Sequence, residues 1–95
     1  MKNNLLFENS NSYFGQYIDA GATGKPFYGY ALNGVASAWT ELDGVNNNWV
    51  LNYGGPKITV SSNGNVGIGT STPAEKLSVS GNICYTGSIA ACSDI

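Results

Sequence analysis

The protein has 95 residues, of which 42% are hydrophobic and only 11% are charged, and its net charge is −2. Four lysines without any arginine cannot line a groove that follows a phosphate backbone, so we expect no nucleic-acid partner. The absence of histidine removes the commonest general base and the commonest zinc ligand, so we expect no metal and no organic cofactor.

Residues 1–60 form an aromatic-rich region in which short apolar runs alternate with turn residues. Asn33-Gly34 and Asp43-Gly44 are typical of tight hairpins, because both pairs tolerate positive φ, and Gly54-Gly55-Pro56 is a further break between runs. Turns at this spacing predict an all-β region that could face a receptor. We place its strands at Leu5–Phe7, Tyr13–Ile18, Pro26–Leu32, Ala36–Leu42, Trp49–Tyr53 and Lys57–Val60.

No part of the sequence is typical of a targeting or membrane segment. The apolar run Leu5–Phe7 is too short for the core of a signal peptide. No other run approaches the roughly 18–20 apolar residues that span a bilayer. We therefore expect no membrane insertion, and release by cell lysis would explain an extracellular location without a signal.

Four aromatic residues in this region are candidates for glycan binding: Tyr28, Tyr30, Trp39 and Trp49. Tyr28 and Tyr30 have the same strand parity, so one face is doubly aromatic there. Rings of this kind stack on sugars, but in small β modules they more often supply core or subunit-interface area. We favour packing and keep glycan binding as the alternative.

Glu41 and Asp43 are the only acidic pair with shared strand parity, and glycosidase chemistry needs two carboxylates. Asp43 precedes Gly44, however, and an Asp-Gly pair is typical of a turn. We therefore expect a turn rather than a catalytic pair, and no enzymatic activity.

Residues 61–95 are rich in Gly and Ser and more regular. Strands are predicted at Asn65–Ile68, Lys76–Ser80, Asn82–Tyr85 and Ser88–Ala91, and a short turn or a single helical turn at Thr72–Leu77. One parity carries Leu77, Val79, Gly81, Ile83 and Tyr85, which we predict to form a trimer interface. Alternatively, Gly81-Asn82 is simply a turn.

Cys84 and Cys92 flank the glycine at position 87. They could pair across a hairpin, bond between subunits or stay free. We favour free thiols, which assembly inside a cell would keep reduced.

The stretch from Asn63 to Ile83 reads NGNVGIGTSTPAEKLSVSGNI. It resembles a recurring segment of phage tail fibres, tail spikes and related bacterial surface proteins. In those proteins the segment lies just before an endosialidase-type intramolecular chaperone domain, which opens with a Ser-Asp-x-Arg-x-Lys pattern. Ser93 and Asp94 match the start of that pattern, and the given chain stops at Ile95.

The resemblance implies a homotrimer of intertwined β-strands, assembled by a C-terminal chaperone that then cleaves itself off. The cleaved bond would join Cys92 and Ser93, with Ser93 as nucleophile and Asp94 beside it. Without the Arg and Lys no base activates Ser93, so we expect no self-cleavage of this chain. The residues after Cys92 indicate either a truncated chain or one that was never cut.

Together these observations predict an all-β, homotrimeric fibre segment, β-prism- or β-helix-like. The resemblance places it in a virion tail fibre or a similar extracellular fibre. Its expected partners are its own copies, the chaperone during assembly, and a host-surface glycan or protein if it contributes to attachment. The alternative is a monomeric carbohydrate-binding β module.

Overall fold

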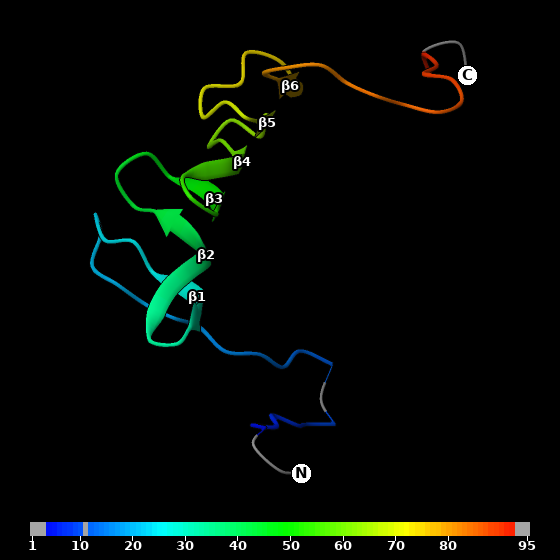
Figure 1. Cartoon of the computed structure of the whole chain (residues 1–95). Coiled ribbons are helices and arrows are strands. Elements are labelled where there is room, and N and C mark those ends of the chain that lie inside the picture. The colour runs from blue at the N-terminus through cyan, green and yellow to red at the C-terminus, as the bar shows by residue number, and fades with distance from the viewer. Residues whose placement is uncertain (1–3, 11, 93–95) are drawn as a thin grey trace.

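The computed structural model describes residues 4–10 and 12–92, and it contains six β-strands and no helix in these residues. The predicted all-β class is therefore confirmed. The strands form a single sheet (Figure 1). They are β1 (Phe27–Leu32), β2 (Val35–Asp43), β3 (Asn48–Asn52), β4 (Pro56–Val60), β5 (Val66–Ile68) and β6 (Leu77–Val79).

The strands follow one another across the sheet in chain order, antiparallel from β1 to β5 and parallel between β5 and β6. Asn33 and Gly34 have φ of 53° and 79°, the conformation that a tight β1–β2 hairpin needs. Gly54 and Gly55, at 67° and 118°, turn the chain between β3 and β4. The turn residues named from the sequence thus set where each of these strands ends.

Four predicted strands are wrong, because Leu5–Phe7, Tyr13–Ile18, Asn82–Tyr85 and Ser88–Ala91 lie outside the sheet. A β-prone run becomes a strand only when a neighbouring strand pairs with its backbone, and these runs lie at the two ends of the chain, beyond the outer strands. The predicted turn at Thr72–Leu77 contains bends up to Lys76 and no helical turn, and Leu77 already begins β6.

The connection from β5 to β6 crosses one face of the sheet and is held by the residues of the recurring motif. Asn65 Nδ2 donates to the Pro73 carbonyl at 3.2 Å, and Pro73 is buried. A Cβ on Gly67 would overlap the Thr70 carbonyl oxygen, so the close approach of this loop requires glycine. The amide of Glu75 donates to Ser78 Oγ at 3.1 Å, which ties the end of the loop to β6.

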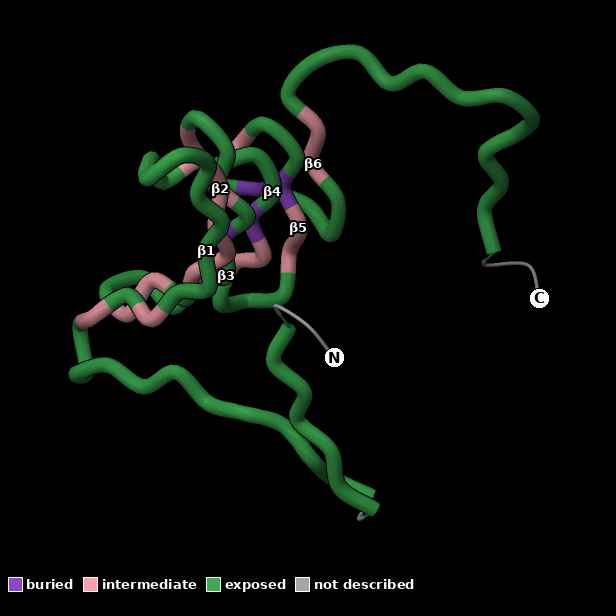
Figure 2. Tube along the Cα trace, turned by 60° about the horizontal axis from the view of Figure 1, so that its bottom comes forward, coloured by how far each residue is buried: buried purple, intermediate pink, exposed green. Residues whose placement is uncertain are grey.

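Very little of the molecule is shielded from solvent. In the described residues, Val50, 8% exposed, and Thr59, 1% exposed, are buried and pair across β3 and β4, and Gly67 and Pro73 are the other buried residues (Figure 2). The radius of gyration is 17.5 Å, against roughly 12 Å for a compact domain of this length. One curved sheet with extended ends is therefore the whole architecture.

Candidate functional site

The two faces of the sheet differ sharply in chemistry. Residues paired across neighbouring strands share a face, so the register assigns each side chain to one side. We define the apolar face as the side carrying Tyr28, Tyr30, Ala38, Thr40, Leu42, Trp49, Leu51, Ile58, Val60, Val66, Ile68, Leu77 and Val79. The opposite, polar face carries Glu41, Asp43, Asn48, Asn52, Thr59 and Ser78, together with Phe27, Trp39 and Val50.

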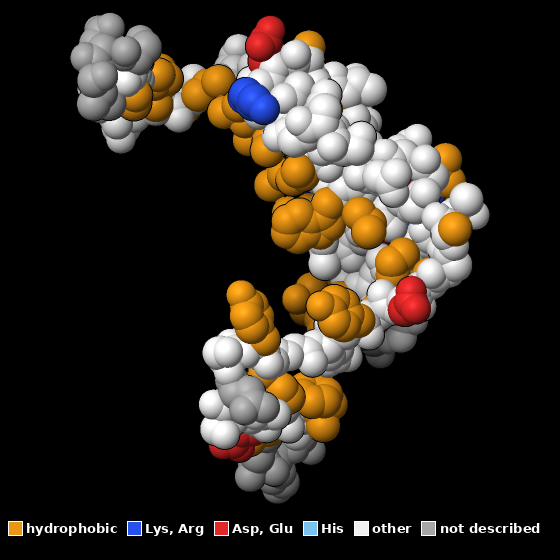
Figure 3. Space-filling view, turned by 180° about the vertical axis from the view of Figure 1, so that it is seen from behind, with side chains coloured by type: hydrophobic (Ala, Val, Ile, Leu, Met, Phe, Trp, Pro, Cys, Tyr) orange, Lys and Arg blue, Asp and Glu red, His pale blue; other side chains and the backbone are white. Residues whose placement is uncertain are grey.

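The side chains of the apolar face form two rows that run across the strands. One row comprises Tyr28, Thr40, Leu51, Ile58, Ile68 and Val79, and the other Leu42, Trp49, Val60, Val66 and Leu77. Most of these side chains are open to solvent, among them Leu51 at 48% and Ile68 at 43%. Figure 3 shows hydrophobic side chains along the concave side of the molecule and a mostly polar outer side.

The four aromatic residues predicted as glycan ligands do not lie together. Tyr28, Tyr30 and Trp49 are on the apolar face, where the two tyrosine rings meet edge to face with centroids 5.7 Å apart. Trp49 Nε1 donates to Thr40 Oγ1 at 2.7 Å. Trp39 points to the opposite side of the sheet. The structure therefore supports a set of three rings rather than four.

A shallow groove of about 540 Å³ lies at the β1–β3 end of the apolar face. Tyr28, Leu42 and Trp49 form part of its lining, and Gln16 and Ile18 of the N-terminal segment complete it. Gln16 and Ile18 therefore contribute to this end of the apolar face.

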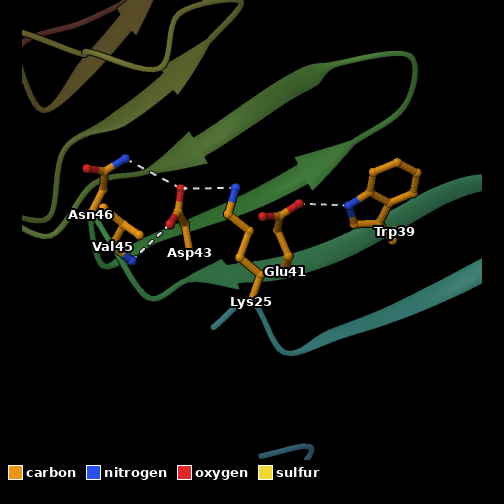
Figure 4. A network of polar contacts seen from close by, with 6 residues as sticks. All are labelled: Lys25, Trp39, Glu41, Asp43, Val45 and Asn46. Carbon is orange, nitrogen blue, oxygen red and sulfur yellow. Dashed lines mark hydrogen bonds and ion pairs between the residues drawn. The ribbon is translucent and has the colours of Figure 1, made fainter. Parts of the chain in front are cut away.

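The polar face holds the acidic pair in local hydrogen bonds (Figure 4). Trp39 Nε1 donates to Glu41 Oε1 at 2.7 Å. Asp43 accepts the Val45 amide at 3.0 Å and lies 3.8 Å from Lys25 Nζ. The chain turns after Asp43 as predicted, but over residues 44–47, with Asn47 (φ 57°) rather than Gly44 in the positive-φ conformation. Both carboxylates make local contacts at the β2–β3 end of the sheet.

The residues predicted for the trimer interface are divided by the end of β6. Leu77 and Val79 lie on the apolar face. Gly81 has φ of 130°, and Ile83 and Tyr85 follow in an exposed segment outside the sheet. The alternation therefore does not continue as one strand, because the chain turns at Gly81, as the alternative prediction held.

The cysteines and the cleavage position lie beyond the sheet. Cys84 and Cys92 are both exposed and free. Ser93 and Asp94 lie outside the described residues, so the geometry of the predicted cleavage site is not seen.

The central residues of the apolar face, Leu51, Ile58 and Ile68, were not singled out from the sequence. A signal was present in β4, where Ile58 alternates with Lys57 and Thr59, but not in β3, where Trp49, Val50 and Leu51 are all apolar. What the sequence lacked was the register, which decides whether the apolar parity of one strand faces the same side as that of the next.

Over residues 4–10 and 12–92, no group of three or more His, Cys, Asp or Glu side chains could hold a metal ion. The same part of the chain has no helix long and apolar enough to cross a membrane. Neither a search of protein-family models nor a search of curated proteins returns a match.

Proposed function

We propose that this protein is a non-catalytic structural segment of a homotrimeric extracellular fibre of the viral tail-fibre type. The motif from Asn63 to Ile83 resembles segments of tail fibres and so suggests this class of protein. In this chain, Asn65 and Gly67 of the motif hold the β5–β6 connection against the sheet. The same proposal includes a chaperone junction at Cys92–Ser93 and a contribution to attachment at a host surface.

The observation that carries the proposal is the exposed surface area of one copy. The chain exposes 8160 Å² for a mass of 9.9 kDa. A folded monomer of this mass exposes roughly 5,200 Å², so roughly 3,000 Å² is in excess. Large hydrophobic side chains are exposed both in the extended ends, such as Tyr17, and on the apolar face, such as Leu51. An area of this size is what obligate assemblies bury between their subunits.

The test is the mass of the purified chain in solution, by sedimentation equilibrium or light scattering. We expect about 30 kDa, three times the 9.9 kDa of one chain. Because so little is buried within one copy, we also expect no folded species at one-third of that mass. A folded, stable monomer would contradict the proposal.

A second candidate function is a monomeric carbohydrate-binding module. The shared face of Tyr28, Tyr30 and Trp49 favours it, because sugar rings stack on exposed aromatic side chains. A monomeric mass together with saturable binding to a glycan panel, lost in Trp49→Ala, would support this function over the fibre.

A further inference from the structure

We infer that the apolar face is the surface on which copies of this chain pack against one another, and that the polar face points outward. The inference rests on the proposed trimer and adds which side of the sheet is buried. It replaces the interface predicted around Gly81 with one centred on Leu51, Ile58 and Ile68.

The first support is the charge distribution within the strands. None of the residues of the apolar face is charged. Glu41 and Asp43 both lie on the polar face. The remaining strand charge, Lys57, is at the register shift between β3 and β4, where it lines a pocket with Tyr30 and Leu51 at the border of the apolar face. Burying an unpaired charge is costly, so a face without one is the side that can be covered.

The second support is that the indole N–H of this face already has a hydrogen-bond partner. Trp49 Nε1 donates to the hydroxyl of Thr40, which is the only polar side chain within the two rows apart from the rings themselves. A covering surface therefore needs hydrogen-bonding groups only for the hydroxyls of Tyr28 and Tyr30. Elsewhere it needs apolar side chains at matching spacing.

The third support is that the chain covers its polar face but not its apolar face. The β5–β6 connection crosses the polar face at Gly67 and shields Thr59 to 1% exposure. On the other side, Gln16 and Ile18 reach only the groove beside Tyr28 and Trp49. In the part of the chain that the structure describes, the rows over β4, β5 and β6 remain open, with Ile68 43% and Leu77 58% exposed, which leaves room for another copy to cover them.

The shape of the apolar face fits other copies of itself. At about 4.8 Å between strands, the row that crosses all six strands is roughly 24 Å long and the row from β2 to β6 roughly 19 Å, while the two rows stand only about 7 Å apart. A long, narrow, uncharged stripe suits packing about an axis parallel to the rows. Around a threefold axis, each row can contact one neighbour. This arrangement would bury Tyr28 and Trp49 and remove them as glycan ligands.

Two neighbouring residues of β1 give a matched test. Tyr28 is 57% exposed on the apolar face, and Phe27 is 59% exposed on the polar face. We expect Tyr28→Lys to lose the trimer at concentrations where wild type is fully assembled, because a lysine would be buried unpaired. Leu51→Lys should do the same. Phe27→Lys should keep the trimeric mass.

A second measurement needs no destabilising substitution. The Trp39→Phe variant keeps only Trp49, and the Trp49→Phe variant keeps only Trp39. In the assembled protein we expect Trp49 emission to be blue-shifted and several-fold less quenched by acrylamide than that of a free indole. Although Trp49 is 56% exposed in one copy, an interface would hide it.

The outcomes separate this inference from the proposed function. A trimeric wild type with a trimeric Tyr28→Lys and a readily quenched Trp49 overturns the choice of face and leaves the fibre proposal standing. A monomeric wild type overturns both.

Discussion

At the residue scale, the hydroxyl group of Thr59 stands out because it is buried without a hydrogen-bond partner. Thr59 is 1% exposed, and its Oγ1 is the one buried side-chain nitrogen or oxygen without a partner in the described residues. An unsatisfied buried polar group costs about 1–3 kcal/mol. Valine has nearly the same shape and removes that cost.

We therefore expect Thr59→Val to raise the free energy of unfolding by about 1 kcal/mol, measured by urea denaturation followed by circular dichroism. Thr40→Val is the matched control, because it removes the acceptor of the Trp49 indole N–H and should lower stability by a similar amount. A destabilised Thr59→Val variant would indicate that the hydroxyl has a partner in the assembled protein.

At the scale of single elements, the β5–β6 connection depends on one residue without a side chain. A Cβ at position 67 would overlap the Thr70 carbonyl oxygen, and the loop backbone would have to move. We expect Gly67→Ala to destabilise the protein by about 3 kcal/mol. The measurement is the midpoint of urea unfolding, or the loss of β circular dichroism if the variant does not fold.

Gly29→Ala serves as its control. A Cβ there would meet the Phe27 ring and Trp39 Cβ at 3.4 Å, which is ordinary contact. Its expected effect stays within about 0.5 kcal/mol. If Gly67→Ala lost no more stability than Gly29→Ala, the β5–β6 connection would be able to move away from the added Cβ at little cost.

The individual strands show how much of this fold can be predicted from the sequence. Strands β1 to β4 were predictable because Asn33-Gly34, Asp43-Gly44 and Gly54-Gly55 mark their ends. Runs at the chain ends, such as Tyr13–Ile18, have equal β propensity but no paired neighbour in the sheet, and propensity contains no information on pairing. The candidate site was missed for a related reason, since the apolar face emerges only from the register of all six strands.

At the scale of the whole molecule, a chain whose described residues bury so few side chains, chiefly Val50, Thr59 and Pro73, should not separate folding from association. If folding and trimerisation are coupled, the melting temperature depends on protein concentration. We expect the melting temperature to rise by about 5 °C for each tenfold increase in protein concentration. This slope follows from the usual unfolding enthalpy per residue, summed over three chains of this length. Differential scanning calorimetry at several concentrations measures it, and a constant melting temperature would contradict the coupling.

The order of strands in the sheet also decides how one copy responds to a pulling force. The chain enters the sheet at β1 and leaves it at β6, so tension on the two ends loads the outermost strands. Each antiparallel hairpin is pulled at its open end, where Phe27 lies opposite Glu41, and its hydrogen bonds break one after another. The parallel pair β5–β6 is pulled lengthwise, so its few bonds are strained together. A single sheet of this topology unzips at low force, and a fibre built from it would resist tension through contacts between its chains.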